Sequence, residues 1–316
     1  MMDHQPQRIA LGLTDVTISP LGIGAWAWGD RFTWDYGRGY ADADVRAAFE
    51  ASLAAGINFF DTAEVYGFGR SERLLGQFVR AAGQPVVIAT KFAPAPWRLW
   101  RGSLLRALRG SLRRLSVPRA DLYQIHWPAQ VSIETWMGAL ADAVEAGLTR
   151  TVGVSNYDLA QMQRAQAALA RRGVTLASNQ IEYSLLHRGP ERNGVLNACR
   201  ELGVTLIAYS PLAMGMLTGK YTPENPPPAR RGRMWSRERL TRIQPLIALL
   251  RQIGEEHGGK TPAQVALNWV ICKGTVPIPG AKNARQAQEN VGALGWSLTA
   301  DEVAVLDEVS DGVRQR

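Results

Sequence analysis

The chain has only two cysteines, Cys199 and Cys272, in 316 residues. Both lie in apolar helical surroundings, and neither has a partner at the spacing of a metal site. This argues against a disulfide framework and against a structural zinc site, and it fits a reducing compartment.

Long apolar runs are also missing. No stretch approaches the roughly 20 apolar residues that a membrane-spanning helix needs. The first eight residues, Met1 to Arg8, are polar and too short for an export signal. We therefore expect a soluble, cytoplasmic protein with no membrane partner.

Lysine is scarce, and the net charge of +8 depends on arginine. The arginines are spread through amphipathic segments such as 101–115, where they alternate with leucines. That pattern is typical of a solvated outer helix face, so we expect no nucleic-acid partner. The five lysines are Lys91, Lys220, Lys260, Lys273 and Lys282.

No Gly-x-Gly-x-x-Gly follows a strand and opens a helix, so the Rossmann dinucleotide site is not supported. What the chain does contain is a regular alternation of short apolar runs and amphipathic helices. The expected barrel strands are 21–24, 57–60, 86–90, 122–125, 151–154, 176–180, 204–208 and 275–278. Eight such units predict an α/β fold, a (β/α)8 TIM barrel formed by residues 1–316 as a single domain.

Two additions to the barrel are expected. A short N-terminal β-hairpin, 11–13 with 16–19, precedes the first strand, and extra helices lie at the C-terminal end. Two helix starts carry possible caps, Asp42 for 42–55 and Ser71 for the helix after the second strand. The C-terminal helices are expected at 241–257, 262–272 and 299–309, with Thr261 as cap and Pro262 in the first turn of the second.

Polar residues follow the apolar strands where each strand ends. In a barrel these positions gather on one face, where the loops form the active site. The residues in question are Asp61, Lys91, His126, Ser155, Asn156, Gln180 and Tyr209.

Four residues near these ends could transfer a proton. The phenol of Tyr66 is a poor acid at neutral pH, but the ammonium of Lys91 would lower its pKa, and Asp61 would keep that ammonium charged. His126 would direct a donor at a substrate oxygen. Taken singly, each has a structural alternative, such as a turn cap or a core histidine. No Ser or Cys accompanies the histidine and no histidine pair suggests zinc, so the set favours reduction of a carbonyl over hydrolysis.

Several motifs together resemble the aldo-keto reductase superfamily. They are Asp61-Thr-Ala-Glu-Val-Tyr66-Gly, Thr90-Lys91, His126, Val152-Gly-Val-Ser-Asn156 and Tyr209-Ser-Pro-Leu212, in order along the chain. The resemblance implies an NADP-dependent oxidoreductase with catalytic Tyr66, Asp61, Lys91 and His126. Trp26-Ala-Trp28-Gly and the segments 92–98 and 271–280 are most similar to the pyridoxal reductase branch.

The resemblance also implies where NADPH would bind. Ser155, Asn156 and Gln180 would hold the nicotinamide amide, and Tyr209 would stack on its ring. Lys282 at a helix start favours NADP over NAD, because both attract an anion. The remaining cofactor candidates are Ser210, Pro211, Leu212, Gly215, Gly280, Gln286 and Asn290. Ser155 and Asn156 could instead cap the helix that begins near Asp158.

Aromatic residues after several strands could form the wall of a substrate pocket. They are Trp26, Trp28, Phe92 and Trp127. Such a wall favours a small aromatic aldehyde, with pyridoxal as the leading candidate, although about half of these rings could simply pack over the barrel mouth. The segment 215–235, rich in proline and arginine, could be a flap over the cofactor phosphates or a surface excursion.

Two other functions remain open at this stage. One is an NADP(H)-binding regulatory subunit with negligible turnover, as the potassium-channel β subunits of the superfamily suggest. The other is a metal-dependent barrel hydrolase, for which the sequence lacks clustered ligands. The oligomeric state is not assigned.

Overall fold

A computed structural model describes residues 7–227 and 235–315. Its centre is an eight-stranded sheet in which neighbouring strands pair in parallel, in the order β10-β9-β8-β7-β6-β5-β4-β3. The strands are β3 (Ile23–Gly24), β4 (Phe59–Asp61), β5 (Val87–Phe92), β6 (Ala120–Ile125), β7 (Thr149–Ser155), β8 (Leu176–Glu182), β9 (Thr205–Tyr209) and β10 (Val276–Pro277).

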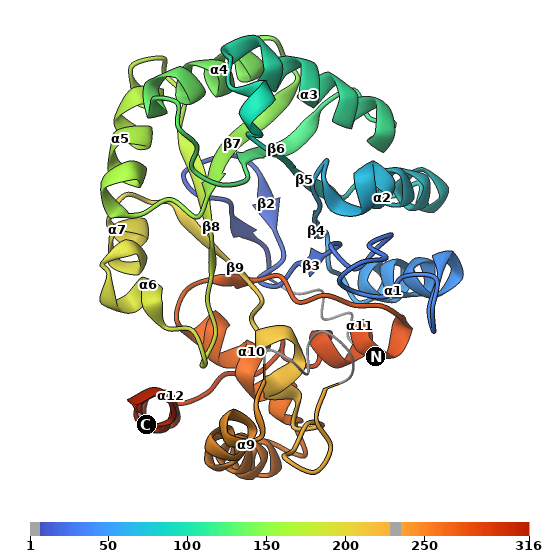
Figure 1. The fold of residues 1–316 in the computed structure, drawn as a ribbon, viewed down its shortest axis with the longest axis vertical. Coiled ribbons are helices and arrows are strands. Elements are labelled where there is room, and N and C mark those ends of the chain that lie inside the picture. Colours follow the sequence, from blue (N-terminus) through green and yellow to red (C-terminus); the bar gives the residue numbers. More distant parts are fainter. Residues whose placement is uncertain (1–6, 228–234, 316) are drawn as a thin grey trace.

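The two edges of this sheet meet. A parallel bridge joins Gly24 to Gly280, and the Gly24 amide donates to the carbonyl of Pro279 at 3.1 Å. The sheet is thus closed and has no free edge. Figure 1 shows the closed ring of strands with helices around its outside. The expected (β/α)8 barrel is confirmed.

Helices connect successive strands around the barrel, as a parallel sheet requires, and two further helices, α11 and α12, follow the last strand. They are α1 (Asp42–Ala54), α2 (Arg70–Ala82), α3 (Arg101–Leu115), α4 (Ile133–Glu145), α5 (Leu159–Ala170), α6 (Gly189–Arg192), α7 (Val195–Glu201), α9 (Arg237–Glu256), α10 (Pro262–Cys272), α11 (Ala284–Val291) and α12 (Ala300–Gln315). The last of these packs against α9 at the C-terminal end, as Figure 1 shows. The extra C-terminal helices are therefore present.

The N-terminal hairpin is also present, as the antiparallel pair β1 (Ile9–Ala10) and β2 (Thr17–Ile18). Its first strand lies earlier than expected, because 11–15 form the turn. The buried side chains of Leu11, Val16 and Ile18 pack with inward-facing residues of the barrel strands. The hairpin therefore fills one end of the barrel and leaves the other end for a site.

Two expected helix caps are wrong. Helix α2 begins after Gly69, and the Ser71 hydroxyl donates instead to the carbonyl of Ala25 at 2.8 Å. Helix α1 begins after Ala41, with Asp42 already inside its first turn. Thr261 and Pro262 do open α10 as expected. The arginines of the expected flap fall in 228–234, outside the described residues.

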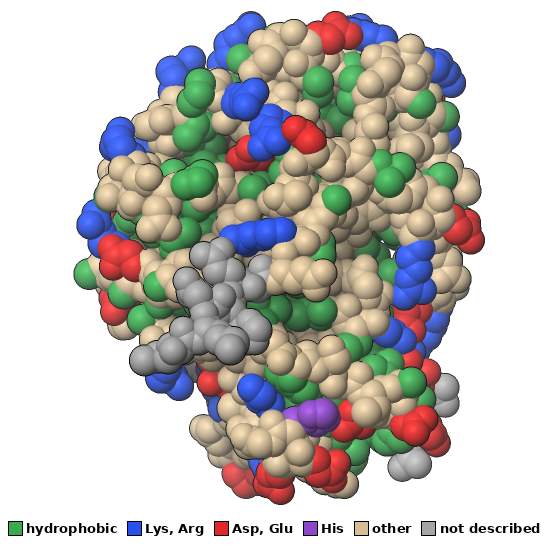
Figure 2. Space-filling view, turned by 180° about the vertical axis from the view of Figure 1, so that it is seen from behind, with side chains coloured by type: hydrophobic (Ala, Val, Ile, Leu, Met, Phe, Trp, Pro, Cys, Tyr) green, Lys and Arg blue, Asp and Glu red, His purple; other side chains and the backbone are tan. Residues whose placement is uncertain are grey.

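The surface charge is mixed. On the face seen in Figure 2, Lys and Arg side chains are spread around the molecule and interspersed with Asp and Glu. Many of the arginines have a carboxylate partner, such as Arg101 with Asp142 at 2.5 Å. Within the described ranges, no helix is both long enough and apolar enough to cross a membrane.

Candidate active site

The four proton-transfer candidates meet at the open end of the barrel. Asp61 is the last residue of β4, Lys91 lies in β5, and His126 directly follows β6. Tyr66 begins the short 3-10 segment η1 (Tyr66–Gly69) that links β4 to α2. Adjacent parallel strands bring their ends to the same edge, and the loop after β4 then returns Tyr66 over Lys91.

Lys91 is the centre of the group. Its side chain is fully buried, and its ammonium donates to a carboxylate oxygen of Asp61 and, at 2.9 Å, to the carbonyl of Thr62. A third contact reaches the Tyr66 hydroxyl at 3.4 Å. Burial alone would lower the pKa of Lys91, but Asp61 and Tyr66 raise it above its ordinary value. The buried ammonium therefore stays charged.

Tyr66 does not behave as the sequence suggested. Burial raises the pKa of its phenol, the Lys91 ammonium lowers it, and Asp61 raises it again, with a net pKa above the ordinary value. The expected lowering of the pKa by Lys91 is present but is outweighed by desolvation. In this state the phenol keeps its proton at neutral pH.

His126 lies beside the phenol. The two rings are edge-on, with centroids 5.6 Å apart. Burial and the neighbouring Lys91 ammonium lower the pKa of His126 from 6.5 to about 3. The imidazole is therefore neutral at physiological pH and can donate only one N–H. Its Nδ1 is buried and has no hydrogen-bond partner in the described part of the chain.

Two glutamines hold the second oxygen of Asp61. The Gln180 amide donates to it at 2.9 Å and the Gln124 amide at 3.2 Å. Gln124 was missed by the sequence analysis. It is fully buried in β6, two residues before His126, so a polar residue inside an apolar strand was the available signal.

A cavity of about 840 Å³ opens above these residues. It is lined by Asp61, Tyr66 and His126, whereas Lys91 lies behind Tyr66. All twelve candidate cofactor residues also line it: Ser155, Asn156, Gln180, Tyr209, Ser210, Pro211, Leu212, Gly215, Gly280, Lys282, Gln286 and Asn290. The structure thus brings together residues that are up to 135 positions apart, from 155 to 290.

Three of these residues form one hydrogen-bonded group at the ends of β7 and β9. The Tyr209 hydroxyl donates to the Asn156 side-chain oxygen at 3.0 Å, and the Asn156 amide donates to the Ser155 hydroxyl at 3.1 Å. Neither Ser155 nor Asn156 caps the following helix, because Asp158 does so by accepting from the amide of Gln161. The capping alternative is therefore wrong.

The far end of the cavity is cationic. Lys282 comes just before α11 and lies over the rings of Trp34 and Tyr40, at 4.9 and 4.5 Å. Arg285, in the first turn of α11, is exposed and lines the same cavity. Arg285 was not among the predicted cofactor residues, although its position three residues after Lys282 was a usable signal. A helix start and two cations suit an anionic group.

Only half of the expected substrate wall faces the cavity. Trp26 and Trp127 line it and are 37% and 38% exposed, respectively. Trp26 is also stacked on the ring of Tyr66, with centroids 6.0 Å apart and an angle of 25°. Trp34, from the same aromatic loop as Trp26, completes this aromatic wall.

Trp28 and Phe92 are corrections, because both are 0% exposed and lie in the hydrophobic core. The Trp28 indole donates to the carbonyl of Ala281 at 2.8 Å, so its polar atom is satisfied away from the cavity. Phe92 packs on Trp136, with centroids 5.2 Å apart. They support the site from behind and do not line it.

Comparison with known proteins identifies the family of this chain. The model of the aldo/keto reductase family matches residues 20–311. The chain belongs to this family. It is therefore an oxidoreductase, and the described residues contain no group of three or more His, Cys, Asp or Glu that could hold a metal ion.

Among curated relatives, the chain is 44% identical to a chloroplastic pyridoxal reductase of Arabidopsis thaliana, over 95% of this chain and 85% of that protein. It is 40% identical to an uncharacterized oxidoreductase of Mycobacterium tuberculosis, over 94% of this chain and 91% of that one.

Among solved structures, this aldo/keto reductase resembles a glycerol dehydrogenase from Gluconobacter oxydans, with a TM-score of 0.83 and 26% identity over 96% of this chain and 94% of that one. It also resembles an aldo/keto reductase from Klebsiella pneumoniae solved with NADP and acetate. That match has a TM-score of 0.77 and 28% identity over 95% and 94% of the two chains.

Proposed function

We propose that this aldo/keto reductase uses NADPH to reduce a small aromatic aldehyde to its alcohol, with pyridoxal as the leading substrate and Tyr66 as the general acid. The observation that carries the proposal is the contact chain from Asp61 through Lys91 to the Tyr66 hydroxyl, which ends at the floor of the cavity. We also propose that residues 1–316 form one domain. The cytoplasmic location stays a prediction, since the Arabidopsis relative is named as chloroplastic.

The cavity fits NADPH in size and in chemistry. Its volume of about 840 Å³ lies in the upper part of the range for cofactor and ligand sites. Amide and hydroxyl groups of Ser155 and Asn156 suit a carboxamide, and the ring of Tyr209 offers a stacking surface. Lys282 and Arg285 at the start of α11 suit a 2′-phosphate. Bound there, NADPH would supply a hydride to the carbonyl carbon.

Within this arrangement Tyr66 supplies the proton. As the carbonyl oxygen of the substrate gains negative charge, the Tyr66 hydroxyl donates its proton to that oxygen, and Tyr66 becomes a phenolate. The Lys91 ammonium, 3.4 Å away, stabilises that phenolate most when the charge has formed. The Lys91 ammonium therefore stabilises the transition state more than the resting state. In the resting state Tyr66 is still protonated, because burial keeps the pKa of the phenol high.

His126 would orient the carbonyl. Because its pKa is about 3, it acts as a neutral donor and does not compete with Tyr66 as an acid. Its Nδ1 is buried without a partner in the described ranges. A buried N–H with no acceptor costs more free energy than a buried ring nitrogen that carries no proton. We infer that the proton sits on Nε2.

The aromatic wall supports the substrate class. Trp26, Trp34 and Trp127 present flat apolar surfaces beside Tyr66. A planar ring buries more area against them than an open-chain sugar does. The similarity to a pyridoxal reductase points in the same direction.

The test is NADPH oxidation at 340 nm over a panel of aldehydes, with NADH compared. We expect pyridoxal and other aromatic aldehydes to give the highest kcat/KM, and NADPH to be preferred. Tight NADPH binding with no oxidation by any aldehyde would instead support the regulatory-subunit alternative. Preference for aliphatic sugars would contradict the proposed substrate class but would leave the proposed carbonyl reduction standing.

A further inference from the structure

A cleft of about 410 Å³ lies between α2 and α3, two helices that pack side by side on the outside of the barrel (Figure 1). We call it the arginine cleft and define it by its lining residues: Arg73, Gln77, Arg80, Gly110, Arg113, Arg114 and Ser116. None of these residues lines the cavity above Tyr66. The arginine cleft is therefore separate from the candidate active site.

The wall that α2 contributes follows from the helical period. Arg73, Gln77 and Arg80 are four and three positions apart, which places them on one side of this helix. Gly76 lies between them in the sequence, and a Cβ there would clash with the backbone carbonyl of Leu115. The glycine thus lets α2 approach the end of α3, and the α2 stripe faces the arginines of that helix.

On the α3 side, two guanidinium groups lie near the same glycine. Arg113 and Arg114 are three and four positions after Gly110, so the three residues share one side of the helix. A Cβ at Gly110 would lie 3.4 Å from Nη1 of Arg114 and 3.9 Å from Nη2 of Arg113. The absence of a side chain at this position leaves open the space beside both cations.

Two of the four arginines have partners. Arg114 donates from Nε to Glu72 at 2.5 Å, and Glu72 is fully buried and does not line the cleft. Arg73 donates to the backbone carbonyl of Phe68 at 3.2 Å, which is a neutral acceptor. A single carboxylate therefore compensates this pair of arginines in the described part of the chain.

The other two arginines have none. Arg80 and Arg113 are exposed, and their guanidinium groups make no ion pair and no hydrogen bond within residues 7–227 and 235–315. The sequence supplies no neighbouring carboxylate either, because 73–120 contains nine arginines and no Asp or Glu. Their charges are available to a ligand.

Helix dipoles offset part of this charge. Arg80 lies in the last turn of α2, and Arg113 and Arg114 lie in the last turn of α3, where cations are favoured. Each helix end contributes about half a negative charge, so the two ends together with Glu72 offset about two of the four arginine charges. About two positive charges remain in the arginine cleft.

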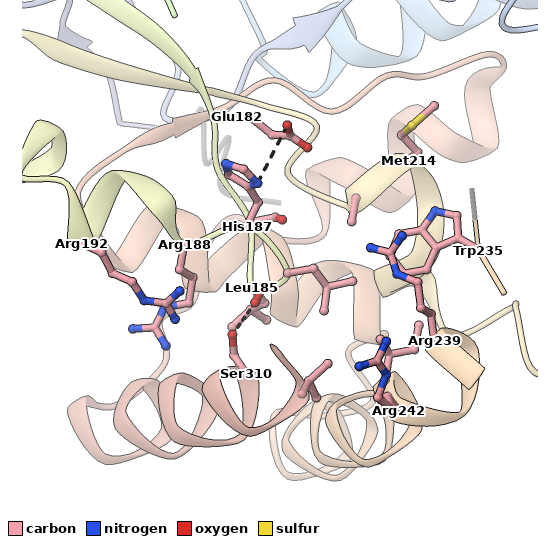
Figure 3. Close-up of a pocket in the computed structure, with 15 residues that line it drawn as sticks. Glu182, Leu185, His187, Arg188, Arg192, Met214, Trp235, Arg239, Arg242 and Ser310 are labelled. Atoms are coloured by element: carbon pink, nitrogen blue, oxygen red, sulfur yellow. Dashed lines mark hydrogen bonds and ion pairs between the residues drawn. The ribbon is translucent and has the colours of Figure 1, made fainter. Parts of the chain in front are cut away.

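Another cavity lined by arginines has a different charge balance. It has a volume of about 300 Å³ and is shown in Figure 3. Its lining includes the carboxylate of Glu182, 4.0 Å from His187, and its Arg188 is paired with Glu191 at 2.6 Å. The described lining of the arginine cleft, by contrast, contains no acidic residue.

The lining favours a compact and fully polar anion. Among its described residues there is no aromatic or aliphatic one, so it offers neither a stacking surface for bases nor an apolar wall. Guanidinium groups bind phosphate oxygens through paired hydrogen bonds, and Gln77 and Ser116 add neutral donors. The volume equals that of roughly 14 water molecules at about 30 Å³ each, which is enough for two or three linked phosphates.

We propose that the arginine cleft is a binding site for an oligophosphate group, a chain of two or three phosphates. The site does not depend on the proposed function, because none of its residues lines the cavity proposed for NADPH. A free inorganic oligophosphate and a nucleoside triphosphate both carry this group. The cleft recognises the phosphates that the two have in common.

The site is tested with tripolyphosphate, by isothermal titration calorimetry on the full chain at low ionic strength, where screening is weak. The double variant Arg80→Gln/Arg113→Gln should weaken one class of tripolyphosphate site at least tenfold. The matched control Arg171→Gln/Arg251→Gln removes the same charge from exposed positions that line neither cavity and should change that affinity less than twofold. Equal affinity in the two double variants would overturn the site.

Arg285→Gln separates the cleft from anion binding in the active-site cavity. This variant should keep the class of tripolyphosphate site that Arg80→Gln/Arg113→Gln loses, because Arg285 lines only the active-site cavity. Binding that is lost in Arg285→Gln and kept in the double variant would assign all of it to the active site and overturn the proposal.

A carboxylate placed in the lining gives a test that removes no arginine. Gln77→Glu keeps the size of an exposed side chain and adds a negative charge among the guanidinium groups, so tripolyphosphate affinity should fall at least threefold. Gln163→Glu, at an exposed position of α5, is the matched control and should bind as the parent does. Equal affinity in these two variants would contradict the site.

ATP and citrate test the source and the chemical class of the ligand. ATP binding as tightly as tripolyphosphate would show that the phosphates suffice, whereas tighter ATP binding that Arg80→Gln/Arg113→Gln abolishes would identify a nucleotide as the source. Both results support the site. Citrate, or a single-stranded DNA 12-mer, binding the cleft more tightly than tripolyphosphate would overturn the assignment to an oligophosphate.

Discussion

The Lys91 ammonium lies 3.4 Å from the Tyr66 hydroxyl and 5.0 Å from the centre of the same ring. The cation thus contacts both the acidic oxygen and the π-face of the phenol. It is placed to stabilise a phenolate while its other protons are held by Asp61 and by the carbonyl of Thr62.

Replacing Tyr66 by Phe should remove the proton donor and keep the ring. We expect kcat for aldehyde reduction to fall by roughly a hundred- to ten-thousand-fold. The NADPH Kd, measured by fluorescence titration, should change less than twofold. Tyr123→Phe is the control, since that buried hydroxyl lies in the core. A Tyr66→Phe variant with the kcat of the parent would contradict the proposed role of Tyr66 as general acid.

Breaking the buried ion pair should affect stability as well as activity. Lys91→Met leaves the Asp61 carboxylate buried without its cation, which we expect to lower the free energy of unfolding by about 3–5 kcal/mol in urea titrations. Adding Asp61→Asn to that variant should recover part of this loss, because the uncompensated charge is gone. A double variant as unstable as the sum of the two single ones would contradict the pairing.

The pH profile of aldehyde reduction should have one falling limb, at a pH above the ordinary tyrosine pKa of 10. As the proposed general acid, Tyr66 must be protonated, and its pKa is raised, so activity is expected below that pKa and should be lost as the pH rises through it. His126 has a pKa lowered to about 3, so no change is expected near its ordinary value of 6.5. An inflection of kcat near 6.5 that disappears in His126→Gln would contradict this assignment.

Cofactor preference should depend on Arg285. Arg285→Gln removes a charge from the end of the cavity proposed for the 2′-phosphate, and charged hydrogen bonds of this type contribute about 1.5–3 kcal/mol. The Kd of NADPH should therefore rise roughly ten- to a hundredfold, by the usual 1.4 kcal/mol per decade, with that of NADH unchanged. Arg38→Gln, in an exposed turn, serves as the control. Equal losses for both cofactors would place the phosphate elsewhere.

Two tryptophans two positions apart should respond differently. Trp26→Ala removes part of the cavity wall, so we expect a higher KM for pyridoxal with little change in stability. Trp28→Ala leaves a core cavity and should lower the free energy of unfolding by about 3–5 kcal/mol. Thermal unfolding together with steady-state kinetics separates the two. Similar KM effects in both variants would contradict the placement of Trp28.

The sequence was sufficient for the barrel and for the convergence of its strand ends, because both follow from alternation. Lys91 and His126 could be placed together for that reason. It was not sufficient for side chains whose partners are remote. Ser71 bonds to Ala25, and the Trp28 indole bonds to Ala281. Local patterns carry no information about such contacts.

The direction of the pKa shift of Tyr66 could not be predicted from the sequence for a related reason. Its sign depends on whether desolvation or the Lys91 charge is larger, and that balance requires the depth of the phenol in the fold. Gln124 was not predicted, because a single glutamine in a strand does not by itself indicate a functional site. Here it shares the Asp61 oxygen with Gln180.

The bridge between Gly24 and Gly280 has a consequence for how the enzyme matures. Trp26 lies two residues after Gly24, and Lys282 lies two residues after Gly280. Both line the cavity. A growing polypeptide cannot assemble the pocket until nearly its whole length has been synthesised. NADPH bound in the proposed site would therefore stabilise only the finished molecule, and truncated products would gain no protection from it.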